Sequence, residues 1–337
     1  MRSFITLMSS RCRMPRLSRL AVASLASLCC AAPTLAVSAD WPTRPVTLVV
    51  PFPAGGGNDV VARLISAAMS TALGQSLVID NRPGAGGTIG AGFVAKAQPD
   101  GYTLLLCSTG NLTVATALYP KLSYGIKDLV PVSHIVNTPT IWVAAPQMPA
   151  NSLKEFISLA RREPGKYNFA SGGNGTTPHL AGVAMKVRNN LEMQHVPYKG
   201  STPAYTDLTA GRVSLMMDSV ISALPFVESG RVKGLAIGTA KRLPQLPAVP
   251  TLAEQGLSDM SFTGWVGICA PSGTPSQVVS KVSQSVNEVL ARPEVREAFV
   301  RQIAEPVGDG PERFAETIQR DALAWRKIVT TSLAEMD

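Results

Sequence analysis

The chain has 337 residues, a formal net charge of +8 and 45 % hydrophobic residues. Five of its 31 basic residues are arginines within the first 39 positions, so the remaining 298 residues carry 26 basic and 23 acidic side chains. This near-neutral remainder has no run of basic residues, which argues against nucleic acid as a partner. Its length is too great for one small core and suits two lobes.

Residues 1–39 have the pattern of a secretory signal peptide. The five arginines precede an apolar stretch of small residues at 20–32, and residues 37–39 offer a small-x-small cleavage site. We expect cleavage after Ala39, with Ala36 as the second choice, and export to the periplasm. The alternatives are an uncleaved anchor and a later start at Met8 or Met14.

A glycine-rich junction at 51–58 joins the first predicted strand to the first predicted helix. Residues 47–50 are apolar and β-branched, three glycines occupy 55–57, and Asn58 or Asp59 can cap a helix that ends at Gly74. A helix N-terminus has unpaired N–H groups and a partial positive charge, so the junction can bind an anion. A tight turn that binds nothing is the alternative, because the Walker A and G-x-G-x-x-G patterns are absent.

Strands and helices alternate along the rest of the chain. Strands are predicted at 77–80, 102–107, 130–135, 140–145, 167–170, 193–196, 213–217, 232–239 and 262–270. Helices are predicted at 91–96, 152–163, 179–187, 276–291, 293–303 and 311–332, with another from Ser201 to Gly211. This order predicts doubly wound, parallel α/β sheets with ligands at the carboxyl ends of the strands.

The segment 167–187 repeats the opening arrangement of strand, glycine loop and helix. We therefore expect residues 40–145 and 264–337 to form one lobe and residues 146–263 to form the other. The apolar segments 142–145 and 266–270 are predicted to cross between the lobes as a two-strand hinge. Two glycine loops facing each other can clamp one carboxylate with backbone N–H groups, without lysine or arginine.

Signals for catalysis or metal binding are weak. The three histidines, His134, His179 and His195, are far apart in sequence, and no G-x-S-x-G elbow is present. Ser171 lies eight residues before His179, so a Ser–His pair is conceivable, although a helix-start histidine bonding its own loop is the simpler reading. We expect no enzymatic activity, no metal and no cofactor.

Cys107 and Cys269 are the two cysteines outside the predicted signal peptide. Each lies near the end of a predicted strand. An exported protein allows one disulfide, but two cysteines with apolar neighbours are more often free and buried. The sequence favours free thiols and leaves a bridge open.

Short segments along the whole predicted mature chain resemble one family. They are WPTRP at 41–45, VPFPAGGG at 50–57 with Asp59 and Arg63, NRPGAGGTIG at 81–90, PDGYTL at 99–104, SGGNGTTPHL at 171–180, HVPYKG at 195–200, LPAVPT at 246–251 and APSGTP at 270–275. The chain resembles the periplasmic solute-binding receptors of tripartite tricarboxylate transporters, the Bug-type family. Gly125 departs from the aspartate usual there, away from the predicted cleft.

The resemblance implies a two-lobed Venus-flytrap (type II) fold, a small carboxylate ligand and delivery to membrane subunits. It implies that the carboxylate is held between residues 52–58 and residues 171–177. A receptor for a sensor kinase is the main alternative, and a secreted hydrolase is another. We expect a monomer. The full set of expected ligand contacts is Phe52, Pro53, Ala54, Gly55, Gly56, Gly57, Asn58, Ser108, Thr109, Asn111, Ser171, Gly172, Gly173, Asn174, Gly175, Thr176, Thr177, His179 and Asp218.

Selection among acids requires side chains beyond the two loops. Ser108, Thr109 and Asn111 follow one predicted strand, and Asp218 is the acidic residue that follows another. A carboxylate at 218 would repel a second ligand carboxylate and favour an amine, a ring N–H or a hydroxyl. The alternative is that Asp218 caps the next turn through Val220 or Ile221.

Overall fold

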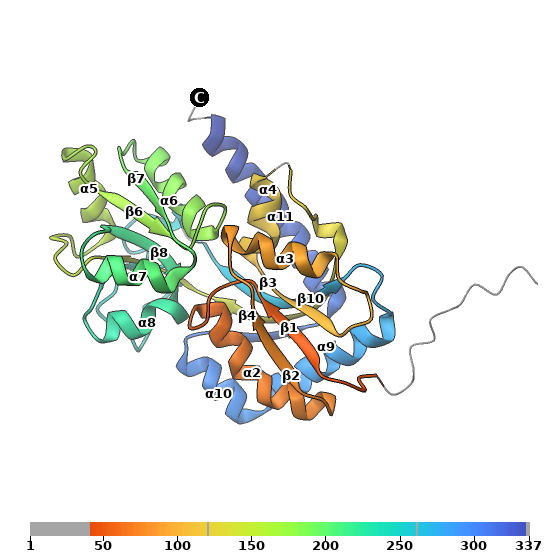
Figure 1. The fold of residues 1–337 in the computed structure, drawn as a ribbon. Coiled ribbons are helices and arrows are strands. Elements are labelled where there is room, and N and C mark those ends of the chain that lie inside the picture. The colour runs from red at the N-terminus through yellow and green to blue at the C-terminus, as the bar shows by residue number, and fades with distance from the viewer. Residues whose placement is uncertain (1–40, 120, 261, 335–337) are drawn as a thin grey trace, which may run out of the picture. The chain divides into compact units, whose positions relative to one another are not determined.

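The computed structural model describes residues 41–119, 121–260 and 262–334, so the predicted signal peptide lies outside the described residues. The chain forms two β-sheets, each flanked by helices, and the prediction of a two-lobed α/β fold is confirmed (Figure 1). The first lobe consists of the six-stranded sheet and the helices that flank it. The second lobe consists of the five-stranded sheet and its flanking helices.

The first lobe has a six-stranded sheet in the order β11-β4-β10-β3-β1-β2. Its strands are β1 (Val46–Val50), β2 (Leu77–Asn81), β3 (Thr103–Ser108), β4 (Leu129–Thr138), β10 (Gly264–Pro271) and β11 (Glu305–Asp309). Its helices are α2 (Gly57–Leu73), α3 (Thr88–Ala95), α4 (Ala115–Leu118), α9 (Ser276–Ala291), α10 (Pro293–Arg301) and α11 (Pro311–Ala334). Within the described ranges, none of the helices is both apolar and long enough to cross a membrane.

The second lobe has a five-stranded sheet in the order β7-β6-β8-β5-β9. Its strands are β5 (Thr140–Ala144), β6 (Asn168–Ser171), β7 (Gln194–Pro197), β8 (Leu215–Ser219) and β9 (Lys233–Ile237). Its helices are α5 (Leu153–Arg162), α6 (Thr177–Arg188), α7 (Ser201–Thr209) and α8 (Val220–Glu228).

The expectation of purely parallel sheets is wrong for three strands, β5, β10 and β11, the last of which is antiparallel to β4. β1 is parallel to β2 and β3, and β6 is parallel to β7 and β8, as predicted. β10 is antiparallel to β3 and β4, however, and β5 is antiparallel to β8 and β9. β5 and β10 enter their sheets directly from the other lobe, so neither is reached through the helical crossover that a parallel neighbour requires.

The crossing between lobes lies earlier than predicted. β4 ends at Thr138 in the first sheet and β5 begins at Thr140 in the second, so the chain changes sheet at Pro139. Trp142 pairs with Met217 inside the second sheet, and the return strand already pairs in the first sheet at Gly264. The placements of the crossings at 142–145 and 266–270, and of the lobe boundary at 145, are therefore wrong. The apolar run before Pro146 is a buried strand of the second sheet. Apolarity alone does not distinguish such a strand from a segment that crosses between the lobes.

The last helix belongs to both lobes rather than to the first alone. Trp325 and Val329 of α11 lie in the same buried apolar cluster as Phe156 and Phe169 of the second lobe. Trp325 also stacks on Phe262, with ring centroids 5.5 Å apart. This helix packs on the second lobe as well as on the first sheet.

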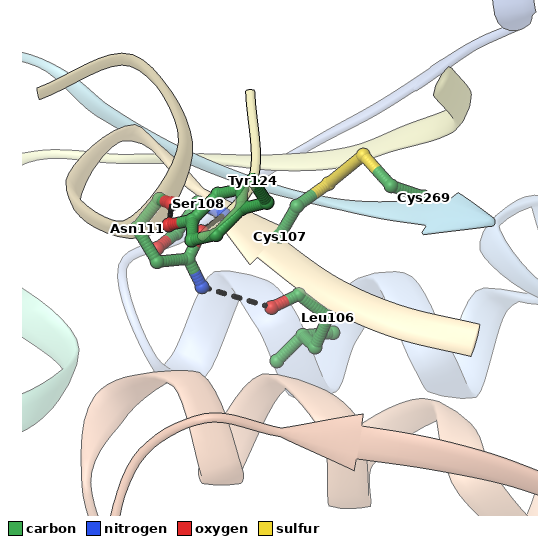
Figure 2. Close-up of a disulfide and its surroundings, with 6 residues drawn as sticks. All are labelled: Leu106, Cys107, Ser108, Asn111, Tyr124 and Cys269. Atoms are coloured by element: carbon green, nitrogen blue, oxygen red, sulfur yellow. Dashed lines mark hydrogen bonds between the residues drawn. A yellow bond between two sulfur atoms is a disulfide. The ribbon is translucent and has the colours of Figure 1, made fainter. Parts of the chain in front are cut away.

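A disulfide joins Cys107 on β3 to Cys269 on β10, so the expectation of free thiols is wrong (Figure 2). The two strands are antiparallel neighbours in which Cys107 lies opposite Gly267, two positions from Cys269. Their Cα atoms are 6.0 Å apart, within the range that a disulfide spans. The pairing depends on β10 lying beside β3, which the parallel sheet predicted from the sequence did not include.

Candidate functional site

A cavity of about 110 Å³ opens between the two sheets, where residues from both lobes meet. This is small beside the roughly 300–1,000 Å³ of sites for drug-sized ligands. The lining residues are Phe52, Pro53, Gly56, Gly57, Asn58, Ser108, Thr109, Gly110, Thr138, Thr140, Gly172, Thr176, Thr177, Pro178, Gly200, Ser201, Met217, Asp218, Ser219, Ser222, Gly264, Trp265 and Val266.

Four helices begin at this cavity. The first residues of α2 and α7, Gly57 and Ser201, line it, as do Thr177 at the start of α6 and Ser219, the residue that caps α8. Each helix start contributes N–H groups without an intrahelical acceptor and a partial positive charge. Among the described residues that line the cavity, none is lysine or arginine, and Asp218 is the charged one. The site can therefore attract an anion through backbone dipoles.

The loop before α2 is held from behind by Asp59. Its Oδ2 accepts hydrogen bonds from the Gly55 N–H at 2.9 Å and from Arg63 Nε at 2.7 Å, and its Oδ1 accepts one from Asn81 Nδ2 at 2.9 Å. Burial acts to raise the pKa of Asp59, but these bonds outweigh it and hold the pKa below its usual value. Asp59 therefore fixes the loop, whereas the residue at the N-cap is Gly56, so capping by Asn58 or Asp59 is not observed.

The loop before α6 is organised by two hydroxyl groups. Ser171 Oγ accepts a hydrogen bond from the Gly173 N–H at 3.1 Å. Thr176 Oγ1 donates to the Gly173 carbonyl at 2.7 Å and accepts from the His179 N–H at 3.4 Å, so Thr176 is the N-cap. Of this loop, Gly172, Thr176 and Thr177 line the cavity.

The serine–histidine pair that forms is not the one considered from the sequence. Ser171 Oγ lies 2.7 Å from His195 Nε2, whereas His179 Nδ1 accepts a hydrogen bond from the Gly175 N–H. The two imidazoles stack with centroids 4.2 Å apart. Burial, with a smaller contribution from His179, lowers the pKa of His195 to about 4. None of these three side chains lines the cavity, so the pair supports the loop.

Ser108 and Thr109 line the cavity, whereas Asn111 is buried beneath them. Asn111 Oδ1 accepts a hydrogen bond from the Ser108 N–H at 2.8 Å, and its Nδ2 donates to the Leu106 carbonyl at 3.4 Å (Figure 2). Tyr124 donates to the Asn111 carbonyl. The amide of Asn111 is thus used in turning the chain after β3, and the expected direct ligand contact is not found in this arrangement.

Asp218 is the second-last residue of β8 and faces the cavity with only 5 % of its surface exposed. Its Oδ1 accepts a hydrogen bond from the Ser219 N–H at 2.8 Å, while Oδ2 is buried without a hydrogen-bond partner. The cap of α8 is Ser219, whose Oγ accepts from the Ser222 N–H, and the Val220 N–H is taken by the Pro139 carbonyl. Capping through Val220 or Ile221, the alternative for Asp218, is not observed.

Trp265 forms a wall of the cavity that the sequence did not identify. Its indole Nε1 donates to Asp321 Oδ2 at 2.9 Å, and Thr113 Oγ1 donates to the same oxygen at 2.6 Å. Its backbone N–H donates to Thr109 Oγ1. Burial raises the pKa of Asp321. These bonds fix the indole between the first sheet and α11.

Several expected contacts lie away from the cavity, and several lining residues were missed. Ala54, Gly55, Asn111, Ser171, Gly173, Asn174, Gly175 and His179 do not line it. The missed lining residues are Gly110, Thr138, Thr140, Pro178, Gly200, Ser201, Met217, Ser219, Ser222, Gly264, Trp265 and Val266. Ser201 opens a predicted helix, so the helix-start signal used for Gly57 and Thr177 could have found it. Ser219 caps α8, a helix that the sequence analysis did not predict.

Small residues let the lobes approach closely beside the cavity. A Cβ on Gly86 would lie 2.5 Å from the Asn174 carbonyl oxygen, and one on Gly200 would lie 2.6 Å from Pro53 Cδ. Both glycines have positive φ, 65° and 115°. A side chain at either position would strain the backbone and separate the two loops.

Two α/β lobes around a cavity lined by helix N-termini define a solute-binding protein of the two-lobed type. The chain belongs to the receptor family of tripartite tricarboxylate transporters, because the model described as "Tripartite tricarboxylate transporter family receptor" matches residues 61–332.

Three solved structures match most of the chain. Periplasmic binding protein BugD is 35 % identical, with a TM-score of 0.83 over 87 % of this chain and 98 % of BugD. MatC from Rhodopseudomonas palustris, with bound malate, is 36 % identical, with a TM-score of 0.82 over 86 % of this chain and 100 % of MatC. Rpa4515 of R. palustris, with adipate, is 36 % identical, with a TM-score of 0.83 over 87 % of this chain and 98 % of Rpa4515. BugD is thus a periplasmic binding protein, and MatC and Rpa4515 hold the carboxylates malate and adipate.

Proposed function

We propose that this protein captures a small carboxylate between the loop before α2 and the loop before α6, and delivers it to the membrane subunits of a tripartite tricarboxylate-type transporter. The family supports the transporter, and the malate and adipate bound by MatC and Rpa4515 support the class of ligand. The signal-peptide pattern at 1–39 supports export to the periplasm.

Four helix N-termini converge on the cavity, and the described residues that line it include no lysine or arginine. This is the main support for carboxylate capture. A carboxylate placed there accepts hydrogen bonds from backbone N–H groups that have no intrahelical acceptor. Hydroxyls of Ser108, Thr109 and Thr177 add donors around it. Fixed dipoles of this kind bind an anion without the entropy cost of ordering a long basic side chain.

A thermal-shift screen of mono-, di- and tricarboxylates against the mature protein tests the proposal. A ligand at 100 times its Kd adds about 2.7 kcal/mol to the free energy of unfolding, so binders raise the melting temperature clearly. Amines and sugars without a carboxylate serve as controls and are expected to leave it unchanged. A screen in which uncharged sugars bind and no carboxylate does would overturn carboxylate capture.

Delivery is tested by uptake. Deleting the gene in its host abolishes uptake of the radiolabelled ligand found in the screen, and the plasmid-borne gene restores it. Normal uptake in the deletion strain, with loss of a transcriptional response to the ligand, points to a sensor-kinase receptor instead.

A further inference from the structure

Asp218 has an unusual place in the cavity wall, because one of its two carboxylate oxygens is buried without a hydrogen bond. The side chain is 5 % exposed at the end of β8, between the strands β6 and β5. Oδ1 accepts from the adjacent Ser219 N–H, and Oδ2 is buried without a hydrogen bond. A buried acceptor without a partner is costly, and a buried charge without one is costlier still.

The surroundings of Asp218 are polar but offer no compensating cation. Hydrogen bonding toward the hydroxyls of Ser201, Ser222 and Tyr205 acts to lower its pKa, although none of these hydroxyls reaches hydrogen-bonding geometry with Oδ2. The Tyr205 hydroxyl that faces Asp218 is likewise buried without a hydrogen-bond partner. Burial is the larger influence and raises the pKa of Asp218 to about 6. Tyr205 on α7 is the titratable group that faces it within the described chain, and burial raises the pKa of that phenol well above its usual value. At neutral pH the carboxylate is therefore charged, with a hydrogen bond to Oδ1 and none to Oδ2.

We propose that Asp218 accepts a hydrogen bond from a hydroxyl or ammonium group of the ligand, so that the ligand carries a carboxylate at one end and a donor group at the other. The inference rests on the carboxylate capture proposed above. An unpaired buried acceptor lowers the stability of the folded protein, so it is expected only where it serves another role. A donor group on the ligand supplies the missing hydrogen-bond partner. A second ligand carboxylate in the same place would meet a like charge at close range, which disfavours diacids.

Asp218 is placed so that it can bind the donor end of a ligand whose carboxylate lies at a helix N-terminus. β6 and β8 are adjacent and parallel, with Ala170 opposite Met216, so Asp218 and Gly172 occupy equivalent strand ends. Gly172 opens the loop that leads to the N-terminus of α6, which attracts the carboxylate. The anion-attracting helix start and the carboxylate acceptor thus lie on neighbouring strands of one wall.

Four acids with the same four carbons isolate the chemistry at the far end: butyrate, 4-hydroxybutyrate, 4-aminobutyrate and succinate. Calorimetry at pH 7.5 measures Kd for each with the mature wild-type protein and with Asp218→Asn. Three-, five- and six-carbon homologues are run in parallel, so the reach of one chain length does not decide the result. In the wild type, the hydroxy or amino acid of the best-fitting length binds at least tenfold more tightly than its methyl- and carboxylate-terminated counterparts. In Asp218→Asn this preference falls below threefold.

Asp321→Asn is the matched control, because Asp321 is a half-buried carboxylate with a raised pKa that does not line the cavity. It holds Trp265, so its loss weakens all the acids together and leaves their order unchanged. Lowering the pH from 7.5 to 5.5 protonates Asp218. In the wild type this reduces the ratio between the Kd of the diacid and the Kd of the amino acid. The reduction is smaller in Asp218→Asn.

A second measurement needs no ligand. Asp218→Asn removes a buried charge, so the ligand-free protein melts at a higher temperature at pH 7.5, whereas loss of a purely structural bond would lower it. A lower melting temperature, or an order of acids that is the same in wild type and Asp218→Asn, would overturn the inference while leaving carboxylate capture intact. If no acid of any length binds, carboxylate capture fails as well.

Discussion

The backbone N–H of Gly57, the first residue of α2, donates a hydrogen bond to Ser222 Oγ on α8 across the cavity, at 3.0 Å. Gly57 belongs to the first lobe and Ser222 to the second, so this bond joins the lobes at the helix starts that line the site. Ser222 Oγ also lies 3.0 Å from Ser219 Oγ. Because Gly57 has no side chain, the two hydroxyls can occupy the space where a Cβ would stand.

Gly57→Ala is predicted to weaken ligand binding at least tenfold, or about 1.4 kcal/mol. The new Cβ would lie 2.7 Å from Ser222 Oγ and 2.8 Å from Ser219 Oγ, too close for the lobes to meet. Gly57 does not have a positive φ, so alanine leaves the fold of each lobe intact. Calorimetry measures the Kd, with Gly125→Ala as the control, because Gly125 lies outside the cavity with only ordinary contacts around its Cβ. Equal Kd values in the two variants would contradict the prediction.

Closure itself is measurable by small-angle X-ray scattering. Saturating ligand is expected to reduce the radius of gyration of the wild type, because it bridges loops from both lobes. The same ligand produces a smaller reduction in Gly57→Ala, since the added methyl keeps the helix starts apart. A wild-type curve that ligand does not alter would mean that the lobes do not move relative to each other.

Thr176→Ala is predicted to cost about 1 kcal/mol of stability through the lost N-cap of α6 and also to weaken binding. Ser152→Ala is the matched control, because Ser152 caps α5 by accepting from the Glu155 N–H at 3.1 Å and does not line the cavity. Chemical denaturation should show similar losses of stability in both variants. Calorimetry should show weaker binding in Thr176→Ala alone, and equal affinities would remove Thr176 from the site.

Replacing both Cys107 and Cys269 by alanine is predicted to lower the free energy of unfolding by about 2–5 kcal/mol. The bond closes a segment of 162 residues, and such a constraint reduces the freedom of the unfolded chain. Guanidinium denaturation with and without reductant measures the effect, and the double variant should not respond to reductant. Two reactive thiols per chain in the unreduced, unfolded mature wild type would show that the bond is absent.

Acid is predicted to destabilise the protein through its histidines. Burial lowers the pKa values of His134, His179 and His195, that of His195 to about 4. A lowered folded pKa favours the neutral form, so this stability is present above the unfolded pKa of about 6.5 and is lost as pH falls toward 4. Asp218, whose pKa is raised to about 6, acts in the opposite direction over part of this range.

The variant His195→Gln separates these contributions. Melting temperatures measured from pH 7.5 to 4 should fall less steeply in His195→Gln than in the wild type, because one group that must protonate in the unfolded chain is gone. Identical slopes would mean that His195 does not change its protonation preference on folding.

The sequence predicted the helix starts better than it predicted the strand neighbours. Gly57 and Thr177 were placed in the site because local composition sets a glycine loop before a helix. The disulfide was missed because it depends on β10 entering beside β3 from the other lobe, which is a long-range pairing. Local periodicity contains no information on that neighbour.

Side-chain direction was also beyond the sequence. Asn111 follows β3 and Asp218 lies near the end of β8, yet Asn111 turns inward to accept a hydrogen bond from the Ser108 N–H while Asp218 faces the cavity. The crossing at Pro139 was missed for a similar reason, since Thr140–Ala144 is as apolar as a seam between lobes but is a fully buried strand. A buried core strand and a segment that crosses between the lobes are both buried and apolar, so these properties do not tell them apart.

The most direct test of carboxylate capture is a crystal structure with the tightest-binding acid from the screen. One ligand carboxylate is expected between the N-termini of α2 and α6, in contact with backbone N–H groups and hydroxyls, directly or through ordered water, and with no lysine or arginine. A carboxylate held by a basic side chain, or bound outside the cavity lined by Gly57 and Thr177, would contradict it.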